Sequence, residues 1–528
     1  MSGVGDAGEG VRHSSVSRAG KSVKYAVLAL VCGVVSVGVA WVFPANSRHY
    51  VSRVPLPKAK VYQAECSAHQ KCVELHIQGL CCPGNGKLQD CCDPIPSTAE
   101  FAGDYGMCYS PEPFKEEGNT FPCDDFMGNW AAPFWKKRGD LDVIRKLNIT
   151  TVRLYGNDMT LDHKEFLDEL EKYGMQAVIG ISDEPYLQDF RNRCGLGGRL
   201  DYNCRWTIQD QFEAMLQKGF TRPVGDGTRR YHPAVKAIIV INEPELKIQF
   251  NLSADDKARA KGYYAKAAIS ALDGMLSAEE NMHVVGSGSL PPFTVTHSFA
   301  TCPECKSANN TVNGSNVGGF SALPFMYDFV HGCLDPSFLD YRPKHDLRAA
   351  LQNRFVLGFN TQNDRDSICT DLLGPLGASP LVGLPVWVGE YKPVAMSDPS
   401  MNPDVFEGDL RKMRHLVDGG MCNASAARLR ALSVFEFQVA YDKGPFDLQM
   451  VYGIHVLGNR VVAHTHPIEQ TNWTSYRVWC LRQRRRVGYP NESWVAPLAQ
   501  VFGGSLTDDS WCPIDPDHPA DLPVPPPS

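Results

Sequence analysis

The sequence has little of what a nucleic-acid or nucleotide binder needs. Its 52 lysine and arginine residues are outnumbered by 59 aspartate and glutamate residues, so the formal net charge is −7 and a strongly basic surface is excluded. It has no phosphate-binding glycine motif in a strand-to-helix context and no histidines at metal-ligand spacing. We therefore expect no nucleic acid, nucleotide, metal or other cofactor. The hydrophobic content of 43% argues against a disordered or collagen-like chain.

Cysteine, by contrast, is abundant. The chain has 18 cysteines in 528 residues, which is high for a reducing compartment and is typical of exported proteins. Seven Asn-x-Ser/Thr glycosylation acceptors agree with export, namely Asn148, Asn251, Asn309, Asn313, Asn423, Asn472 and Asn491.

One long apolar run lies near the N-terminus. Residues 25–43 carry no charge over 19 residues, which as a helix would span about 28 Å, enough to cross a bilayer. All seven acceptors and 17 of the 18 cysteines follow this run. We expect a single-pass type II membrane protein with a cytoplasmic tail over 1–24 and a lumenal or extracellular remainder. Secretion after signal-peptide cleavage is the alternative.

A short cysteine-rich segment follows a Pro-containing stalk over 44–65. Six cysteines fall within 27 residues: Cys66, Cys72, Cys81, Cys82, Cys91 and Cys92. We predict a disulfide-stapled module over 66–95, because so short a chain buries too little core to fold unaided. Whether it binds carbohydrate or only spaces the next domain stays open. Apart from Cys32 in the apolar run, 11 cysteines remain, so if the module closes on itself at least one is free, bonded to the module or paired with another chain.

From about residue 100 the chain alternates strand-like runs with helical stretches, which is typical of a parallel sheet. The eight predicted strands are Tyr105–Tyr109, Thr151–Tyr155, Gln176–Ser182, Val235–Asn242, Met282–Gly286, Arg354–Asn360, Pro385–Glu390 and Leu432–Phe437. Predicted helices include Leu141–Leu147, His163–Tyr173, Gln209–Lys218, Ala254–Met275 and Phe406–Val417. We predict an α/β fold, a (β/α)8 TIM barrel over 100–500 with long βα-loop insertions, and a Pro-rich tail over 513–528.

Two glutamates end predicted strands of this barrel. Glu243 follows the fourth strand, in Asn242-Glu243-Pro244, and Glu390 ends the seventh, before Tyr391. Catalytic groups of such barrels project from the carboxyl ends of strands. Two carboxyl groups facing each other across the barrel mouth can divide the work of glycoside cleavage between an acid/base and a nucleophile.

This placement resembles the clan-A retaining glycosidases, and the motifs resemble the fungal β-1,3-glucanosyltransferases of glycoside hydrolase family 72. The matching stretches are 106–110, 151–163, 176–182, 241–243, 385–391, 435–437 and 452–454. The related plant-type β-1,3-glucanases share the barrel and both glutamates. The resemblance implies a β-glucan polysaccharide or oligosaccharide as substrate, processed by transfer or by hydrolysis.

The resemblance also implies roles for residues of this chain. Glu243 would be the acid/base and Glu390 the nucleophile, with Asn242 holding the sugar 2-hydroxyl and Tyr391 orienting Glu390. The expected substrate-binding residues on the donor side and the rim are Tyr109, Arg153, Tyr155 and Asn360.

The chain also departs from that family. Asn360 is followed by Thr361-Gln362-Asn363 instead of an aromatic and acidic stretch, and the cysteine-rich segment and anchor precede the barrel. Five aromatic residues are candidate sugar platforms: Trp130, Phe134, Trp135, Tyr186 and Trp206. A catalytically silent carbohydrate-binding surface protein is the alternative from another class, although such a protein would not need both glutamates.

Overall fold

The computed structural model describes residues 101, 104–113, 124–181, 194, 202–244, 254–286, 290–299, 311–312, 315–316, 326, 330, 340–377, 380–393, 402–422, 425–443, 451–468 and 475–514. Several expectations lie outside these ranges: the tail and apolar run over 1–43, the stalk, the cysteine-rich module, and residues 515–528 of the Pro-rich tail. Within the described ranges, none of the helices combines the length and apolarity that crossing a membrane requires.

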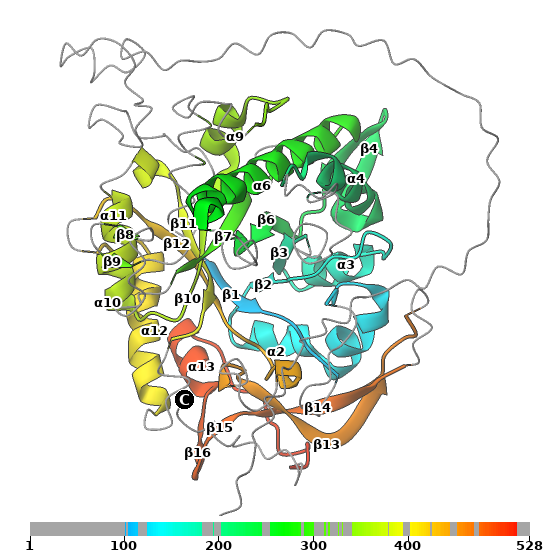
Figure 1. Ribbon diagram of the computed structural model, residues 1–528. Helices are drawn as coiled ribbons and strands as arrows, with labels where there is room; N and C mark the ends of the chain where they lie inside the picture. The colour runs from blue at the N-terminus through cyan, green and yellow to red at the C-terminus, as the bar shows by residue number, and fades with distance from the viewer. Residues whose placement is uncertain are drawn as a thin grey trace, which may run out of the picture.

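Eight parallel strands close into a barrel, as the sequence predicts (Figure 1). They are β1 (Asp104–Cys108), β2 (Thr151–Arg153), β3 (Gln176–Gly180), β6 (Val235–Asn242), β7 (Phe293–Phe299), β10 (Phe355–Thr361), β11 (Val386–Tyr391) and β12 (Leu429–Val434). Each strand pairs with the next along the chain, and β12 pairs with β1 to close the ring. All eight carboxyl ends therefore meet at one rim.

The prediction of the fifth barrel strand is wrong. Met282–Gly286 contributes one isolated bridge, between Val284 and Arg229, and the fifth barrel strand is β7 instead. Thr294 and Thr296 of β7 are buried beside Gly358 of β10 inside the barrel. A strand with polar inward-facing residues lacks the continuous apolar run by which buried parallel strands are identified in a sequence.

Helices surround the barrel. The longer ones are α2 (Asp140–Lys146), α3 (Lys164–Lys172), α4 (Arg205–Met215), α6 (Ala254–Asn281), α9 (Leu347–Arg354), α12 (Pro403–Val417) and α13 (Ala496–Phe502). Short helical turns are η2 (Asn129–Ala131), η3 (Pro133–Arg138), η5 (Leu216–Phe220), α10 (Arg365–Ser367), η6 (Ile368–Leu373), α11 (Gly374–Gly377), η7 (Pro380–Gly383) and η9 (Tyr441–Lys443). Local sequence sets where α12 begins, because the Asn402 side chain caps the Val405 amide and Pro403 occupies the first helical position.

Within the part of the chain that the structure describes, four short antiparallel pairs lie outside the barrel. They are β4 (Thr221–Gly225) with β5 (Thr228–Tyr231), β8 (Thr311–Val312) with β9 (Ser315–Asn316), β13 (His455–His464) with β14 (Arg477–Gln483), and β15 (Arg485–Arg486) with β16 (Tyr489–Ser493). The β13–β14 ribbon packs against η3 and lies at the opposite end of the molecule from α6 in Figure 1.

Two apolar layers hold the barrel together. The outer layer packs the strands against helices such as α3, which buries Phe166, Leu167 and Leu170. The inner layer includes Val356 and Trp387. Each fully buried side chain of this size stabilises the fold by about 1.5–3 kcal/mol.

Three disulfides join described segments: Cys194–Cys204, Cys369–Cys422 and Cys480–Cys512. Cys108 on β1 is a free, buried thiol. Among the described cysteines, Cys108 is thus one free thiol of the kind that the odd count predicts if the module closes on itself.

Two of the seven glycosylation acceptors fall in described ranges. Asn148 and Asn491 are both exposed, and Asn148 Nδ2 donates a hydrogen bond to the Phe502 carbonyl at 2.7 Å. The other five acceptors, Asn251, Asn309, Asn313, Asn423 and Asn472, lie outside the described ranges.

Candidate active site

The guanidinium of Arg153, at the carboxyl end of β2, connects three other strands at the barrel rim. Its Nη1 donates to Asn360 Oδ1 at 2.8 Å, and its Nη2 donates to Asn242 Oδ1 at 2.9 Å. Nη2 also lies 3.0 Å from Glu390 Oε1. Arg153 is fully buried, so these contacts act with little screening by water. Four residues predicted from the sequence to form the site are thus brought together.

Bulges in two strands turn key side chains inward. On β6, Ala237 and Ile239 face the barrel interior, and a register shift against β7 between Ile239 and Ile241 brings Asn242 to the same face. On β11, Trp387 faces inward, and a shift against β10 brings Glu390 into register with Asn360. A bulge adds one residue to one strand and so re-aims the side chains that follow it.

Glu390 is a buried carboxylate held by several donors. It is 4% exposed; besides Arg153, Asn360 Nδ2 donates to Oε1 at 3.1 Å and Lys392 Nζ donates to Oε2 at 3.2 Å. Burial acts to raise the pKa of Glu390, but the charges of Arg153 and Lys392 outweigh it and hold that pKa below its ordinary value. The side chain is therefore ionised and fixed in place, as a nucleophile must be.

The carboxamide of Asn242 is oriented by its neighbours. Its Oδ1 accepts hydrogen bonds from Arg153, from Thr296 Oγ1 at 2.6 Å and from Asn360 Nδ2 at 3.0 Å. Since the oxygen accepts all three, the Nδ2 group of Asn242 is the end that can donate to a substrate hydroxyl.

Glu243 follows β6 with an unusual backbone. Its φ is 50°, in the left-handed region that non-glycine residues rarely adopt, and its amide donates to the Thr296 carbonyl at 2.7 Å. The side chain is half-buried. Outliers of this kind gather at functional sites, where the surrounding structure holds them in place.

Lys392 links the two glutamates electrostatically. Burial acts to lower its pKa, but the charges of Glu390 and Glu243 raise that pKa above its ordinary value. Its ammonium lies 4.4 Å from the centre of the Phe435 ring and 6.0 Å from that of Tyr452. Lys392 is therefore a cation that contacts Glu390 and interacts electrostatically with Glu243.

Two further groups lie near Glu390. The Tyr155 ring centre is 4.8 Å from the Arg153 guanidinium, and burial is the largest cause that raises the pKa of Tyr155 well above its ordinary value, with the charge of Glu390 acting in the same direction. Cys108 Sγ donates to the Gly389 carbonyl at 3.3 Å, and burial raises its pKa to about 12. Both groups therefore stay protonated at neutral pH.

Tyr109 and Tyr391 do not face this set. The Tyr109 hydroxyl donates to Asp140 at 2.9 Å, and its ring packs on Phe166 of α3, outside the barrel. Tyr391 is in register with Thr361 and so lies on the outward-facing side of its strand, one position past the inward-facing Glu390. The predictions that Tyr109 lines the donor side and that Tyr391 orients the nucleophile are corrected, because side chains alternate between faces along a strand.

Three of the candidate sugar platforms are also corrected. Trp130, Phe134 and Trp135 are buried in the core, where Trp130 and Phe134 pack edge to face. Trp206 on α4 is 59% exposed, and Tyr186 lies outside the described ranges.

Two contributors to the site were missed in the sequence. Lys392 stands two residues after Glu390 and could have been recognised in the sequence, because a charged residue just past a strand end projects toward the same rim. Thr296 was missed because the strand that carries it was assigned elsewhere.

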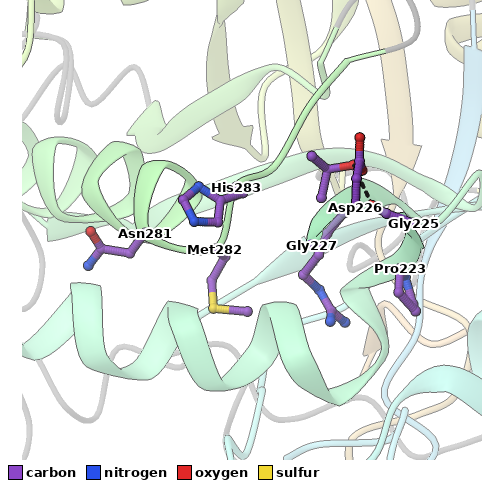
Figure 2. A pocket seen from close by; sticks show the side chains of 9 residues that line it. Pro223, Gly225, Asp226, Gly227, Asn281, Met282 and His283 are labelled. Atoms are coloured by element: carbon purple, nitrogen blue, oxygen red, sulfur yellow. Dashed lines mark hydrogen bonds between the residues drawn. The ribbon is translucent and has the colours of Figure 1, made fainter.

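A surface pocket of about 300 Å³ lies away from these residues. Figure 2 shows the side chains of Asn281, Met282 and His283, at the end of α6, beside the β4–β5 hairpin. The hairpin precedes β6, so the pocket is near the amino ends of the barrel strands, and neither glutamate lines it.

Among the described residues, one group has the composition of a metal site, formed by Asp168, Glu171 and His232. The guanidinium of Arg222 already lies within it, with Nη2 at 2.6 Å from Asp168 and 2.5 Å from Glu171, and it also contacts His232. Arg222 thus supplies the positive charge that a metal would bring.

Of the comparisons with known proteins, the one with solved structures finds matches. No protein-family model matches the chain, and no curated protein does. One similar structure is Saccharomyces cerevisiae Gas2 in complex with laminaritriose and laminaritetraose (12% identity, 78% of this chain, 66% of that chain, TM-score 0.40). Another is Gas2 in complex with a ligand named compound 9 (12% identity, 79% of this chain, 68% of that chain, TM-score 0.42). A β-glucosidase from Thermotoga maritima in complex with glucoimidazole is also similar (10%, 78%, 100%, 0.41). Gas2 is of the glucanosyltransferase family that the sequence motifs resemble. At these levels of similarity, the function has to be inferred from the chain's own site.

Proposed function

We propose that the protein is a retaining transglycosylase that remodels cell-wall or storage β-1,3-glucan by double displacement. The observation that supports this most strongly is Glu390, a buried carboxylate kept ionised by Arg153 and Lys392 at the rim where Glu243 also stands. The choice of β-1,3-glucan rests on the sequence motifs.

The mechanism divides the work between the two glutamates. Glu390 attacks the anomeric carbon while Glu243 protonates the leaving oxygen, and a covalent glycosyl-enzyme forms. Glu243 then deprotonates the acceptor, whose oxygen displaces Glu390 and restores the configuration. Asn242 donates from Nδ2 to the sugar 2-hydroxyl. We expect the two carboxyl groups to be about 5–5.5 Å apart in the working enzyme.

Hydrolysis is the second candidate. The same glycosyl-enzyme reacts with water if water reaches it before a sugar hydroxyl does. A β-1,3-glucanase would use the same residues in the same roles, so the acceptor alone separates the two activities.

The cellular setting is part of the proposal. The apolar run over 25–43 would anchor the chain as a single-pass type II membrane glycoprotein, with the barrel in the lumen or outside the cell. The glycosylation acceptors support this orientation, and secretion after cleavage is the alternative.

Product lengths test the proposal directly. The full-length protein is incubated with β-1,3-gluco-oligosaccharides, alongside Glu243→Gln and Glu390→Gln. The matched control is Glu165→Gln, an exposed residue on α3 that pairs with Lys136. We expect products longer than the substrate from the wild type and the control, and a loss of about 10³-fold or more in both active-site variants.

Other results of this experiment would favour a different function or overturn the catalytic assignment. Products that are only shorter than the substrate would indicate a β-1,3-glucanase. A wild type that binds the oligosaccharides without converting them would indicate a silent carbohydrate-binding protein, and variants as active as the wild type would overturn the catalytic assignment.

A further inference from the structure

Lys392 occupies a position from which it can act on both glutamates in turn. It follows β11, and its backbone amide donates to the Thr361 carbonyl at 3.1 Å, which extends the pairing of β11 with β10. Its side chain is 13% exposed, and the ammonium contacts Glu390 Oε2 at 3.2 Å. The backbone and the Phe435 ring therefore fix this cation beside the nucleophile.

The charged and titratable groups that interact electrostatically with Lys392 come from several elements. Glu390 lies on β11, Glu243 follows β6, Glu436 follows β12, and Tyr452 lies between η9 and β13. Burial, followed by repulsion from Glu112, raises the pKa of Glu436 well above its ordinary value. Glu390 contacts the Lys392 ammonium directly, and the charges of Glu390 and Glu243 are the two causes that do most to raise the pKa of Lys392.

We propose that Lys392 is a positioning residue that serves as a shared counter-ion, first for Glu390 and then for Glu243. The inference rests on the proposed function. It names the cation that stabilises the negative charge of whichever glutamate is ionised at each step. Before the reaction, Lys392 and Arg153 stabilise the ionised form of Glu390.

The negative charge moves from Glu390 to Glu243 in the first step of the reaction and returns to Glu390 in the second. In the first step the anomeric carbon forms a bond to Glu390 and breaks its bond to the leaving oxygen, which receives the proton of Glu243. Glu390 is then a neutral ester, and Glu243 is the ionised carboxylate whose charge interacts with that of Lys392. Lys392 disfavours protonation of Glu243 by solvent, so Glu243 remains a base. In the second step the acceptor gives its proton to Glu243 and its oxygen displaces Glu390, which regains its charge.

The test is the pH dependence of two kinetic constants. The substrate is a 2,4-dinitrophenyl β-glycoside of a laminari-oligosaccharide, whose good leaving group makes breakdown of the glycosyl-enzyme limit kcat. In Lys392→Met, we expect the acid limbs of both kcat/KM and kcat to move upward by about one pH unit or more. At pH values below the shifted acid limb, kcat of the variant should be about tenfold or more lower than that of the wild type. The glycosyl-enzyme should accumulate under these conditions and be detected by mass spectrometry. Lys392→Arg, which keeps the charge, should stay close to the wild type.

Azide separates this role from a merely structural one. Azide is a nucleophile that needs no general base, so it should restore turnover of Lys392→Met at pH values below the shifted limb. Lys136→Met, which removes an exposed lysine paired with Glu165, is the matched control and should change neither limb. If Lys392→Met fails to fold, as judged by its thermal unfolding, Lys392→Gln replaces it.

The outcomes distinguish the inference from the function on which it rests. Unshifted acid limbs in an active Lys392→Met, or a shift in Lys392→Arg as large as that in Lys392→Met, would overturn the inference. A wild type and a Lys136→Met control that are both inactive would overturn the proposed function, and the inference with it.

Discussion

Arg153 joins four strands of the barrel through one side chain. Its planar guanidinium contacts Asn242, Asn360 and Glu390, and its faces lie against the rings of Tyr155 and Trp387 at 4.8 Å and 5.4 Å. A guanidinium can donate in several directions within one plane, whereas an ammonium is a compact point charge on a flexible stem. The site therefore needs the planar guanidinium of an arginine at this position, and a positive charge alone would not make the same contacts.

Replacing Arg153 by lysine tests this requirement. In Arg153→Lys we expect kcat/KM to fall about 100-fold or more, because Glu390 and both asparagines lose a shared donor. The wild-type acid limb of kcat/KM should lie below the ordinary range for a glutamate, because the pKa of Glu390 is lowered, and the limb should move upward in the variant. The measurement is a pH profile of kcat/KM, with Arg145→Lys, at an exposed position on α2, as control. An unchanged acid limb would contradict the role given to Arg153.

At the scale of the element, seven of the eight barrel strands could be predicted, and the reason is visible in their composition. Residues 237–241 of β6 and 386–389 of β11 are continuous apolar runs, and a polar residue follows each of them. The exception is β7, whose Thr294 and Thr296 face inward, so the strand lacks such a run. Glu243, Glu390 and Asn242 could be named as candidate site residues because each stands at the end of a predicted strand, and Arg153 because of the motif that contains it. Their catalytic roles are what the family resemblance implies, and these roles stay predictions.

The remaining site assignments depended on the direction of side chains. Tyr109 and Tyr391 stand at the correct strand ends but on the outer face, and the bulge that brings Glu390 inward leaves no sign in the sequence. A shift of one residue reverses the face of every side chain that follows. The sequence therefore predicts which strand ends build a site more reliably than it predicts which residues point into it.

The closure between β1 and β12 allows a test at the same scale. Gly106 faces Ser433, and a methyl group added at Gly106 would lie 2.4 Å from Ser433 Oγ, the atom that accepts a hydrogen bond from Trp387 Nε1 at 3.2 Å. Gly106→Ala should therefore lower the free energy of unfolding by about 1–3 kcal/mol, as expected for overpacking in a core. Adding Ser433→Gly should recover part of this loss, because it removes the clashing atoms.

Chemical denaturation of the wild type, both single variants and the double variant measures this coupling. A double variant whose destabilisation equals the sum of the two single effects would show that the two residues do not limit each other's space.

At the scale of the whole molecule, barrel closure brings together residues that lie far apart in the chain. Arg153 and Asn360 are 207 positions apart yet hydrogen-bonded at 2.8 Å. The connections after β1, β3, β6, β7 and β11 are long, as the sequence predicts for an enlarged barrel. The architecture thus supplies a rigid ring, and the function depends on the few polar side chains that project from its carboxyl end.

The central claim is that Glu390 becomes covalently bonded to the sugar, and trapping this intermediate tests it most directly. The full-length protein is treated with a 2-deoxy-2-fluoro β-laminari-oligosaccharyl fluoride, whose 2-fluorine slows breakdown of the ester more than its formation. Intact-mass spectrometry and peptide mapping then locate the adduct, with Glu390→Gln as the control. We predict one glycosyl adduct on the peptide that contains Glu390 and none in the control. An adduct on a different residue, or no adduct in a wild type that converts β-1,3-gluco-oligosaccharides, would contradict the account.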